Sequence, residues 1–155
     1  MDMLKAIAAS AVLMMPVAAA AQNVVAKTGD SVANFFKDEG AKVEVTTDSV
    51  GDPNLKVEYY GNDFSVYYYG CDGNKDCEAI QFFSGYQTDG GVRLSKINEW
   101  NNENRFARGY VSEEGSARIE MDVFLGNKGM SPDDFAQAVG IWNRAMQDFE
   151  AFIDW

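Results

Sequence analysis

The sequence contains no histidine, only two cysteines and only three prolines among its 155 residues. Histidine is the usual general base at neutral pH, so its absence excludes His-based catalytic triads and histidine metal sites. Two cysteines alone do not complete a tetrahedral zinc site. No glycine-rich phosphate loop is present, and the aspartates and glutamates are spread over turns and strand faces, so the sequence singles out no carboxylate pair for acid–base catalysis. The sequence therefore predicts a protein that is not an enzyme and that uses no cofactor and no metal ion.

Positive charge is also scarce. Lysine and arginine together number 13, against 24 aspartates and glutamates, which gives a net charge of −11. Such a balance repels the phosphates of nucleic acids and the headgroups of anionic lipids. We therefore expect no nucleic-acid partner, whereas basic protein partners remain compatible with the charge.

The N-terminus, MDMLKAIAASAVLMMPVAAAAQ, places a lysine before a short apolar run that ends in small residues. This layout is typical of a secretory signal peptide, with Ala19 and Ala21 forming the cleavage site before Gln22. The alternative, a membrane anchor, needs about 20 strongly apolar residues, but this run is shorter, alanine-rich and broken by proline. We expect cleavage of residues 1–21, no membrane span afterwards, and a periplasmic or secreted protein.

The rest of the chain shows no internal repeat, and its hydrophobic content of 46% is enough for a core. A flexible leader over residues 22–28 is expected to precede one domain over residues 29–155. Helices are predicted in SVANFFKDEG, in VRLSKINEWNNEN and after Ser131, and strands in KVEVTTD, LKVEYYG, NDFSVYYYGC, CEAIQFFSGY, RFARGYVS and SARIEMDVFL. Helices grouped around runs of strands predict an α+β two-layer sandwich: an antiparallel sheet with helices on one face.

Two segments have the clearest patterns. The last helix begins with Ser131 as N-cap and Pro132 at the first helical position. Its apolar residues recur at spacings of three and four, which is typical of a helix laid on a core: Phe135, Val139, Trp142, Met146, Phe149 and Phe152 or Ile153. The last strand alternates without a break, with Ala117, Ile119, Met121, Val123 and Leu125 on one side.

The two cysteines frame the stretch CDGNKDC, between two strand-like runs. An oxidising compartment converts such a pair into a disulfide, and the intervening residues have the composition of a turn. If Cys71 and Cys77 lie directly opposite in a hairpin, their Cα atoms are about 5.5 Å apart, within disulfide reach. Asp72, Asn74 and Asp76, at alternate positions of this turn, resemble the start of a calcium loop. However, Cys77 and Phe83 stand where that loop needs glycine and glutamate.

Pairing the cysteines also determines which residues share each face of the hairpin. Phe64, Val66, Tyr68, Ile80 and Phe82 fall on one face, which suits the core. The other face carries Tyr67, Tyr69 and Phe83 together with both cysteines, and it is more apolar than a solvated face requires. Either another element covers these side chains, or they form a surface for a partner.

From KINEWNNENRFARGYV onward, the sequence resembles the YbjN-like family of bacterial proteins. The features that carry the resemblance are Asn98, Trp100, Asn101, Arg105, Phe106 and Tyr110, followed by the acidic turn at Gly115, the IEMDVFL strand and GMSPDDF. The resemblance implies a fold like that of type III secretion chaperones, which dimerise and bind extended protein segments. It also implies a role as a sensory-transduction regulator. The signal peptide and the cysteine pair depart from a cytoplasmic secretion chaperone.

The Asn98, Asn101, Asn102 and Asn104 cluster beside Arg105 is consistent with a polar binding site, or with caps for helix ends and turns. We favour capping. The function that the sequence best supports is a non-catalytic, exported, chaperone-like or regulatory module of the envelope, which binds a protein partner or forms a homodimer. The alternative is an envelope protein that binds a small ligand or an ion.

Overall fold

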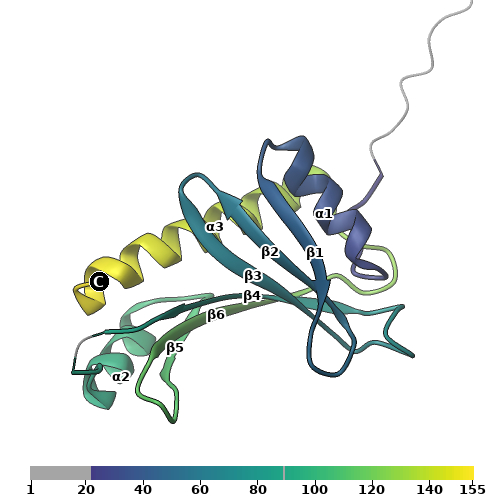
Figure 1. The fold of residues 1–155 in the computed structure, drawn as a ribbon. Coiled ribbons are helices and arrows are strands. Elements are labelled where there is room, and N and C mark those ends of the chain that lie inside the picture. The colour runs from purple at the N-terminus through teal and green to yellow at the C-terminus, as the bar shows by residue number, and fades with distance from the viewer. Residues whose placement is uncertain (1–21, 89) are drawn as a thin grey trace, which may run out of the picture.

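A computed structural model describes residues 22–88 and 90–155 of the chain. These residues form three helices and six strands (Figure 1), in an order that confirms the predicted α+β class. The elements are α1 (Gly29–Asp38), β1 (Lys42–Thr47), β2 (Pro53–Tyr59), β3 (Asn62–Tyr69), β4 (Ala79–Tyr86), α2 (Leu94–Glu103), β5 (Arg108–Val111), β6 (Ala117–Phe124) and α3 (Pro132–Ile153).

The strands form one antiparallel sheet in the order β1-β2-β3-β4-β6-β5. Strands that are consecutive in the sequence pair as hairpins, except β4 and β5. Strand β4 instead pairs with β6, and the connection between these two strands contains α2 and β5. In that pairing Ile80 lies opposite Val123 and Phe82 opposite Met121. This long-range pair therefore brings the C-terminal hairpin beside the cysteine-bearing hairpin.

The core lies between one face of the sheet and the helices. The alternating residues of β6 from Ala117 to Leu125 are buried, as predicted, and so are Phe64, Val66, Tyr68, Ile80 and Phe82. In α3, Ser131 caps the helix by accepting a hydrogen bond from the Asp134 N–H. The apolar stripe of this helix is buried against the sheet, with Trp142 stacked on Phe82 at 5.7 Å between ring centroids. The prediction that this stripe faces the core is confirmed.

Two helices differ in detail from the prediction. Helix α1 starts earlier than expected, because Thr28 occupies the N-cap position and Asp30 lies in the first turn. Helix α2 is shorter than the predicted segment VRLSKINEWNNEN, and within it Ile97 and Trp100 are buried whereas Leu94, its first residue, is 69% exposed.

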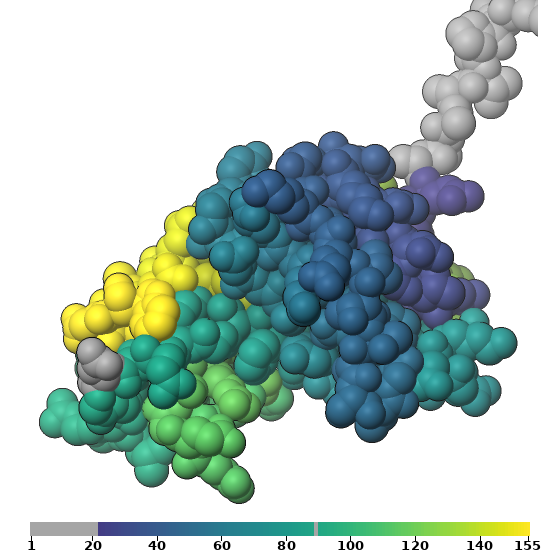
Figure 2. Space-filling view, viewed as in Figure 1, coloured from purple at the N-terminus to yellow at the C-terminus, as the bar shows by residue number. Residues whose placement is uncertain are grey.

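Residues 22–28 do not form the flexible leader that the sequence predicts. Val24 and Ala26 are buried, and Val24 pairs with Met130 through two backbone hydrogen bonds of 2.8 and 3.0 Å. Figure 2 shows these purple residues against the body of the domain. This segment therefore packs on the domain and pairs with the loop before α3. The contact joins residues far apart in the chain, so no local sequence pattern predicts it. The expected cleavage site at Ala19 and Ala21 lies outside the described residues.

Cys71 and Cys77 are joined by a disulfide, with their Cα atoms 3.8 Å apart. The hairpin register agrees with the predicted pairing, since Tyr69 lies opposite Ala79. The Cα atoms are closer than the expected 5.5 Å because neither cysteine belongs to a strand. The prediction that both cysteines share a face with Tyr69 is wrong. Gly70, with φ of 67°, interrupts the alternation, and Cys77 is 2% exposed within the core.

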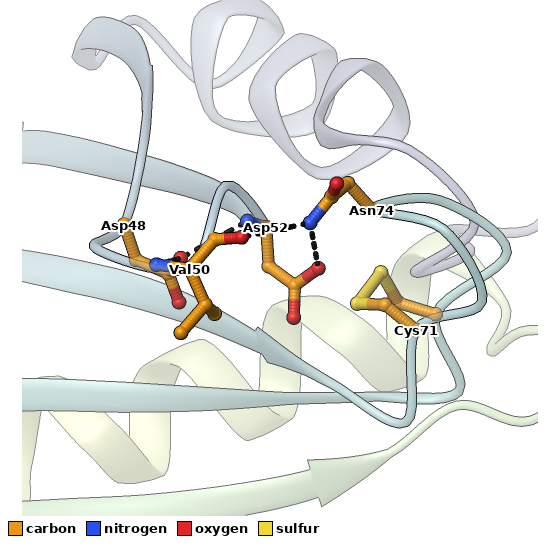
Figure 3. The surroundings of a disulfide bond; sticks show 6 residues. Asp48, Val50, Asp52, Cys71 and Asn74 are labelled. Atoms are coloured by element: carbon orange, nitrogen blue, oxygen red, sulfur yellow. Dashed lines mark hydrogen bonds between the residues drawn. A yellow bond between two sulfur atoms is a disulfide. The ribbon is translucent and has the colours of Figure 1, made fainter.

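The disulfide loop is also held by its neighbours (Figure 3). The Asn74 side-chain amide donates hydrogen bonds to the Val50 carbonyl at 3.1 Å and to Asp52 Oδ1 at 2.9 Å. The Asp76 N–H donates to the Lys27 carbonyl at 2.7 Å. The loop therefore joins the N-terminal segment and the β1–β2 turn to the end of the β3–β4 hairpin.

Candidate functional site

The sheet face opposite the core, called the open face here, carries the candidate site. Its residues follow from the register: Tyr67 and Tyr69 of β3, Gln81 and Phe83 of β4, Arg118, Glu120 and Asp122 of β6, and Arg108 and Tyr110 of β5. The outward side chains alternate with the core residues along each strand. Two hairpins that are separate in the sequence, β3–β4 and β5–β6, therefore contribute to one surface.

The aromatic side chains of the open face are in contact with one another or with an arginine. Tyr67 and Phe83 pack edge to face, with ring centroids 5.7 Å apart. The Arg118 guanidinium lies 5.9 Å from the ring centroids of both Phe83 and Tyr110, within the range of a cation–π contact. Tyr69 is 48% exposed, while Tyr67 and Phe83 are half-buried. The three predicted aromatic residues thus share one face, and no helix of the described chain buries them.

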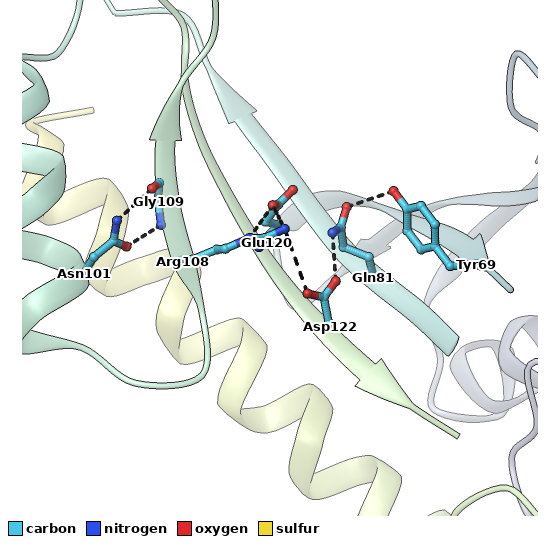
Figure 4. Close-up of polar contacts among 7 residues, drawn as sticks. All are labelled: Tyr69, Gln81, Asn101, Arg108, Gly109, Glu120 and Asp122. Atoms are coloured by element: carbon cyan, nitrogen blue, oxygen red, sulfur yellow. Dashed lines mark hydrogen bonds and ion pairs between the residues drawn. The ribbon is translucent and has the colours of Figure 1, made fainter. Parts of the chain in front are cut away.

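A chain of polar contacts crosses the same face from β3 to β5 (Figure 4). The Tyr69 hydroxyl donates to Gln81 Oε1 at 3.3 Å, and Gln81 Nε2 donates to Asp122 Oδ1 at 2.8 Å. Asp122 lies 4.0 Å from the Arg108 guanidinium, whose Nε donates to Glu120 Oε1 at 2.6 Å. Because each side chain is oriented by the next, the network holds the polar groups in place between the aromatic rings.

Electrostatics at this site centre on Glu120, a carboxylate that is only 8% exposed. A buried carboxylate needs a charged partner, and Arg108 supplies it. The hydrogen bond to Glu120, reinforced by its charge, raises the pKa of Arg108 above its usual value. Partial burial, followed by the nearby Glu120 and Asp122 carboxylates, raises the pKa of Tyr69, so that its phenol stays a neutral hydrogen-bond donor.

The open face is hollowed into a shallow trough and not into a closed cavity. One part, of about 340 Å³, is lined by Tyr67, Tyr69, Phe83 and the polar network. A second part, of about 530 Å³, continues over β1 and β2 between Lys42 and Lys56, and Phe83 borders both parts. The trough thus runs across the strands, which suits an extended occupant more than an enclosed small molecule.

The residues that carry the family resemblance are not gathered at the open face. Trp100 is buried against Phe149 at 5.0 Å between ring centroids, whereas Asn98, Arg105 and Phe106 are exposed and only Tyr110 reaches the open face. Asn101 binds backbone: its Oδ1 accepts from the Gly109 N–H at 2.8 Å, and its Nδ2 donates to the Gly109 carbonyl at 3.0 Å. Asn101 therefore occupies the free edge of β5 as another strand would.

The comparison with known protein families agrees with the resemblance that these residues carry. Residues 28–155 match the profile of the family described as "YbjN: Putative bacterial sensory transduction regulator". The chain belongs to the YbjN family. No curated protein matches the sequence, so nothing more specific is carried over from a relative. The family description is that of a regulator and not of an enzyme, which is compatible with a non-catalytic regulatory module.

Sequence reasoning missed most of the polar half of the open face of this YbjN domain. The alternation in β6 places Arg118, Glu120 and Asp122 opposite the core residues, and this signal was visible in the sequence. What could not be read was the β4–β6 pairing, which sets Glu120 opposite Phe83 and Asp122 opposite Gln81. Without that pairing, the aromatic hairpin and the charged hairpin looked like separate surfaces.

The described part of the YbjN chain brings no group of three or more cysteine, aspartate or glutamate side chains into a metal-binding arrangement. Across residues 22–88 and 90–155, the helices are too short or too polar to cross a bilayer. The Asn104 side chain donates to the Trp100 carbonyl at 3.1 Å, so two of the clustered asparagines bind backbone, as the capping interpretation predicts.

Proposed function

We propose that this YbjN chain is an exported, non-catalytic regulatory module that binds an extended segment of a partner protein in the trough of its open face. The observation that carries the proposal is the cluster of Tyr67, Tyr69, Phe83 and Tyr110 on a sheet face that no helix of the described chain covers. Partly exposed tyrosines beside ordered polar groups are the side chains that contribute most to protein interfaces.

The shape of the site favours a protein segment over the alternative small ligand. Small-molecule sites bury most of their ligand in a concave pocket, whereas this trough is open along the sheet. Its two parts meet at Phe83 and extend from β1 to β5. An extended segment can lie across the strands and contact both parts at once.

Charge indicates the chemistry of the partner. The chain carries a net charge of −11, which accelerates encounter with a basic protein and opposes encounter with an acidic one. On the open face, Glu120 and Asp122 lie among tyrosines whose rings are able to contact a lysine or an arginine, as Phe83 contacts Arg118. We therefore propose a basic partner segment and treat a second acidic copy of this chain as the less favoured occupant.

Replacing Tyr69 with serine tests the site, with Tyr60→Ser as the matched control. Tyr60 is 78% exposed but lies in the β2–β3 turn, away from the open face. When residues 22–155 capture proteins from an envelope extract, we expect Tyr69→Ser to reduce the captured partner about ten-fold. Tyr60→Ser should leave the amount unchanged, and both variants should unfold at the parent temperature.

Equal capture by the Tyr69→Ser and Tyr60→Ser variants would show that binding does not use the open face. A partner that is acidic, or whose capture rises with added salt, would contradict the proposed charge preference. Light scattering on the pure chain measures self-association. A dimer that forms in the parent and is lost in Tyr69→Ser would show that a second copy of the chain is the occupant.

Export is the other half of the proposal. It is supported by the signal-like pattern of residues 1–21 and by the disulfide, which is typical of oxidising compartments. Mass spectrometry of the chain from its native host should find Gln22 as the first residue and no free thiol. A retained N-terminal segment, or two reactive cysteines, would exclude an envelope role.

A further inference from the structure

Phe106, in the loop between α2 and β5, has an unusual conformation. Its φ is 69°, and the N–H of Ala107 donates to the Arg105 carbonyl at 2.9 Å, which closes a γ-turn around it. A γ-turn with positive φ is rare and strained, and a bulky residue is disfavoured there. The turn nevertheless holds the phenyl ring 73% exposed. No burial within the described chain compensates for this arrangement, so the ring is available to a partner.

The exposed ring borders a groove of about 500 Å³ between the end of α2 and the outer side of α3. Apolar atoms of Trp100, Ile141 and Ala145 line this α2–α3 groove together with Phe106. Gly140 lies on the α3 side, and no atom comes within 4 Å of the position that its Cβ would take. A glycine inside a long helix lowers the wall of the groove and allows another backbone to approach closely.

Two arginines flank the α2–α3 groove, one from each side. Arg105 precedes Phe106, and Arg144 belongs to α3. Neither makes an ion pair with a described residue, whereas Arg108 and Arg118 of the open face are both paired. The groove has one carboxylate, Asp148, so it is locally basic on a protein of net charge −11. Guanidinium groups bind carboxylates through paired hydrogen bonds, which indicates an acidic occupant.

We propose that the α2–α3 groove is a second binding site, which takes an acidic amphipathic helix of a partner protein. Apolar side chains of that helix, at spacings of three and four, enter between Phe106 and Ile141. Acidic side chains on its flanks reach Arg105 and Arg144. The groove lies on the helical side of the domain, so this site is independent of the open face and prefers the opposite charge.

The test uses the chain over residues 22–155 and a fluorescent synthetic helix with leucines at spacings of three and four and glutamates on both flanks. Anisotropy measures its dissociation constant. We expect Phe106→Gly and Arg144→Glu each to weaken binding about ten-fold or more. The matched controls, Phe124→Ser and Arg93→Glu, change an exposed phenylalanine and an exposed arginine elsewhere and should bind like the parent. A peptide with lysines in place of the glutamates should bind about ten-fold more weakly.

Phe106→Gly also separates a binding role from a structural one. Glycine adopts positive φ without strain, so the variant should unfold at a higher temperature than the parent while it loses the peptide. Parent-like binding by Phe106→Gly, a lower unfolding temperature, or equal affinity for the two peptides would overturn the proposal. Binding lost in Tyr69→Ser but retained in Phe106→Gly would also overturn it and leave the open face as the site. A dimer abolished by Phe106→Gly would do the same, because a second copy would then be the occupant.

Discussion

Replacing both Cys71 and Cys77 with serine should lower the free energy of unfolding by about 2 to 3 kcal/mol. In the chain-entropy description, a disulfide that closes a loop of this size raises the free energy of the unfolded state by about 2 kcal/mol, because it lowers the entropy of the unfolded chain. A further cost arises because Cys77 is buried in the core, where a serine hydroxyl loses its hydration. Urea unfolding of parent and double variant measures the difference.

Reduction provides the control for the disulfide prediction. A reducing agent should shift the urea midpoint of the parent toward that of the double variant and leave the variant unchanged. Tyr69 is two residues from Cys71, and its carbonyl accepts a hydrogen bond from the Glu78 N–H at 3.0 Å. Because Tyr69 is held next to the disulfide, loss of the disulfide should also weaken binding at the open face. Identical midpoints for parent and double variant would mean that the hairpin is held by its other contacts, such as those of Asn74.

Gly109→Val should destabilise the domain by about 3 kcal/mol. A Cβ at Gly109 would lie 2.9 Å from Phe149 Cε2 and 3.3 Å from Trp100 Cδ1, and both rings are buried. Overpacking of a filled core costs about 1 to 3 kcal/mol, and valine falls at the upper end because its two methyl groups enlarge the clash. Thermal and urea unfolding provide the measurement.

Gly85→Val is the matched control for the close approach of Gly109. Gly85 also lies within a strand, but its Cβ would meet only ordinary contacts of 3.7 Å and longer on the open face. We expect its stability to stay within about 0.5 kcal/mol of the parent. Equal losses for the two variants would show that valine disturbs the strands themselves and not the contact with Phe149 and Trp100.

The Gly109 prediction also bears on the proposed function. Gly109 stands between Arg108 and Tyr110, two residues whose side chains lie on the open face. A strand pushed away from Phe149 would carry both side chains with it and loosen the Arg108–Glu120 pair. The small residue on the core side therefore helps to position the polar half of the proposed site.

Several elements were determined by the sequence alone, because their signals are local. The apolar residues of α3 recur with the period of a helix, and those of β6 with the period of a strand. Ser131 and Pro132 mark the start of α3, and the turn between Cys71 and Cys77 sets the hairpin register. Each pattern depends only on the geometry of a short stretch of chain, so it can be read without knowledge of the fold.

Tertiary structure decided what those elements face. Val24 pairs with Met130, about a hundred residues away, and Asn101 binds the edge of β5. The pairing of β4 with β6 places Glu120 beside the tyrosines and creates one continuous open face. Such contacts form between residues distant in the chain, where many alternative pairings have similar local patterns. Only packing of the whole core selects among them, and the two proposed binding sites depend on that selection.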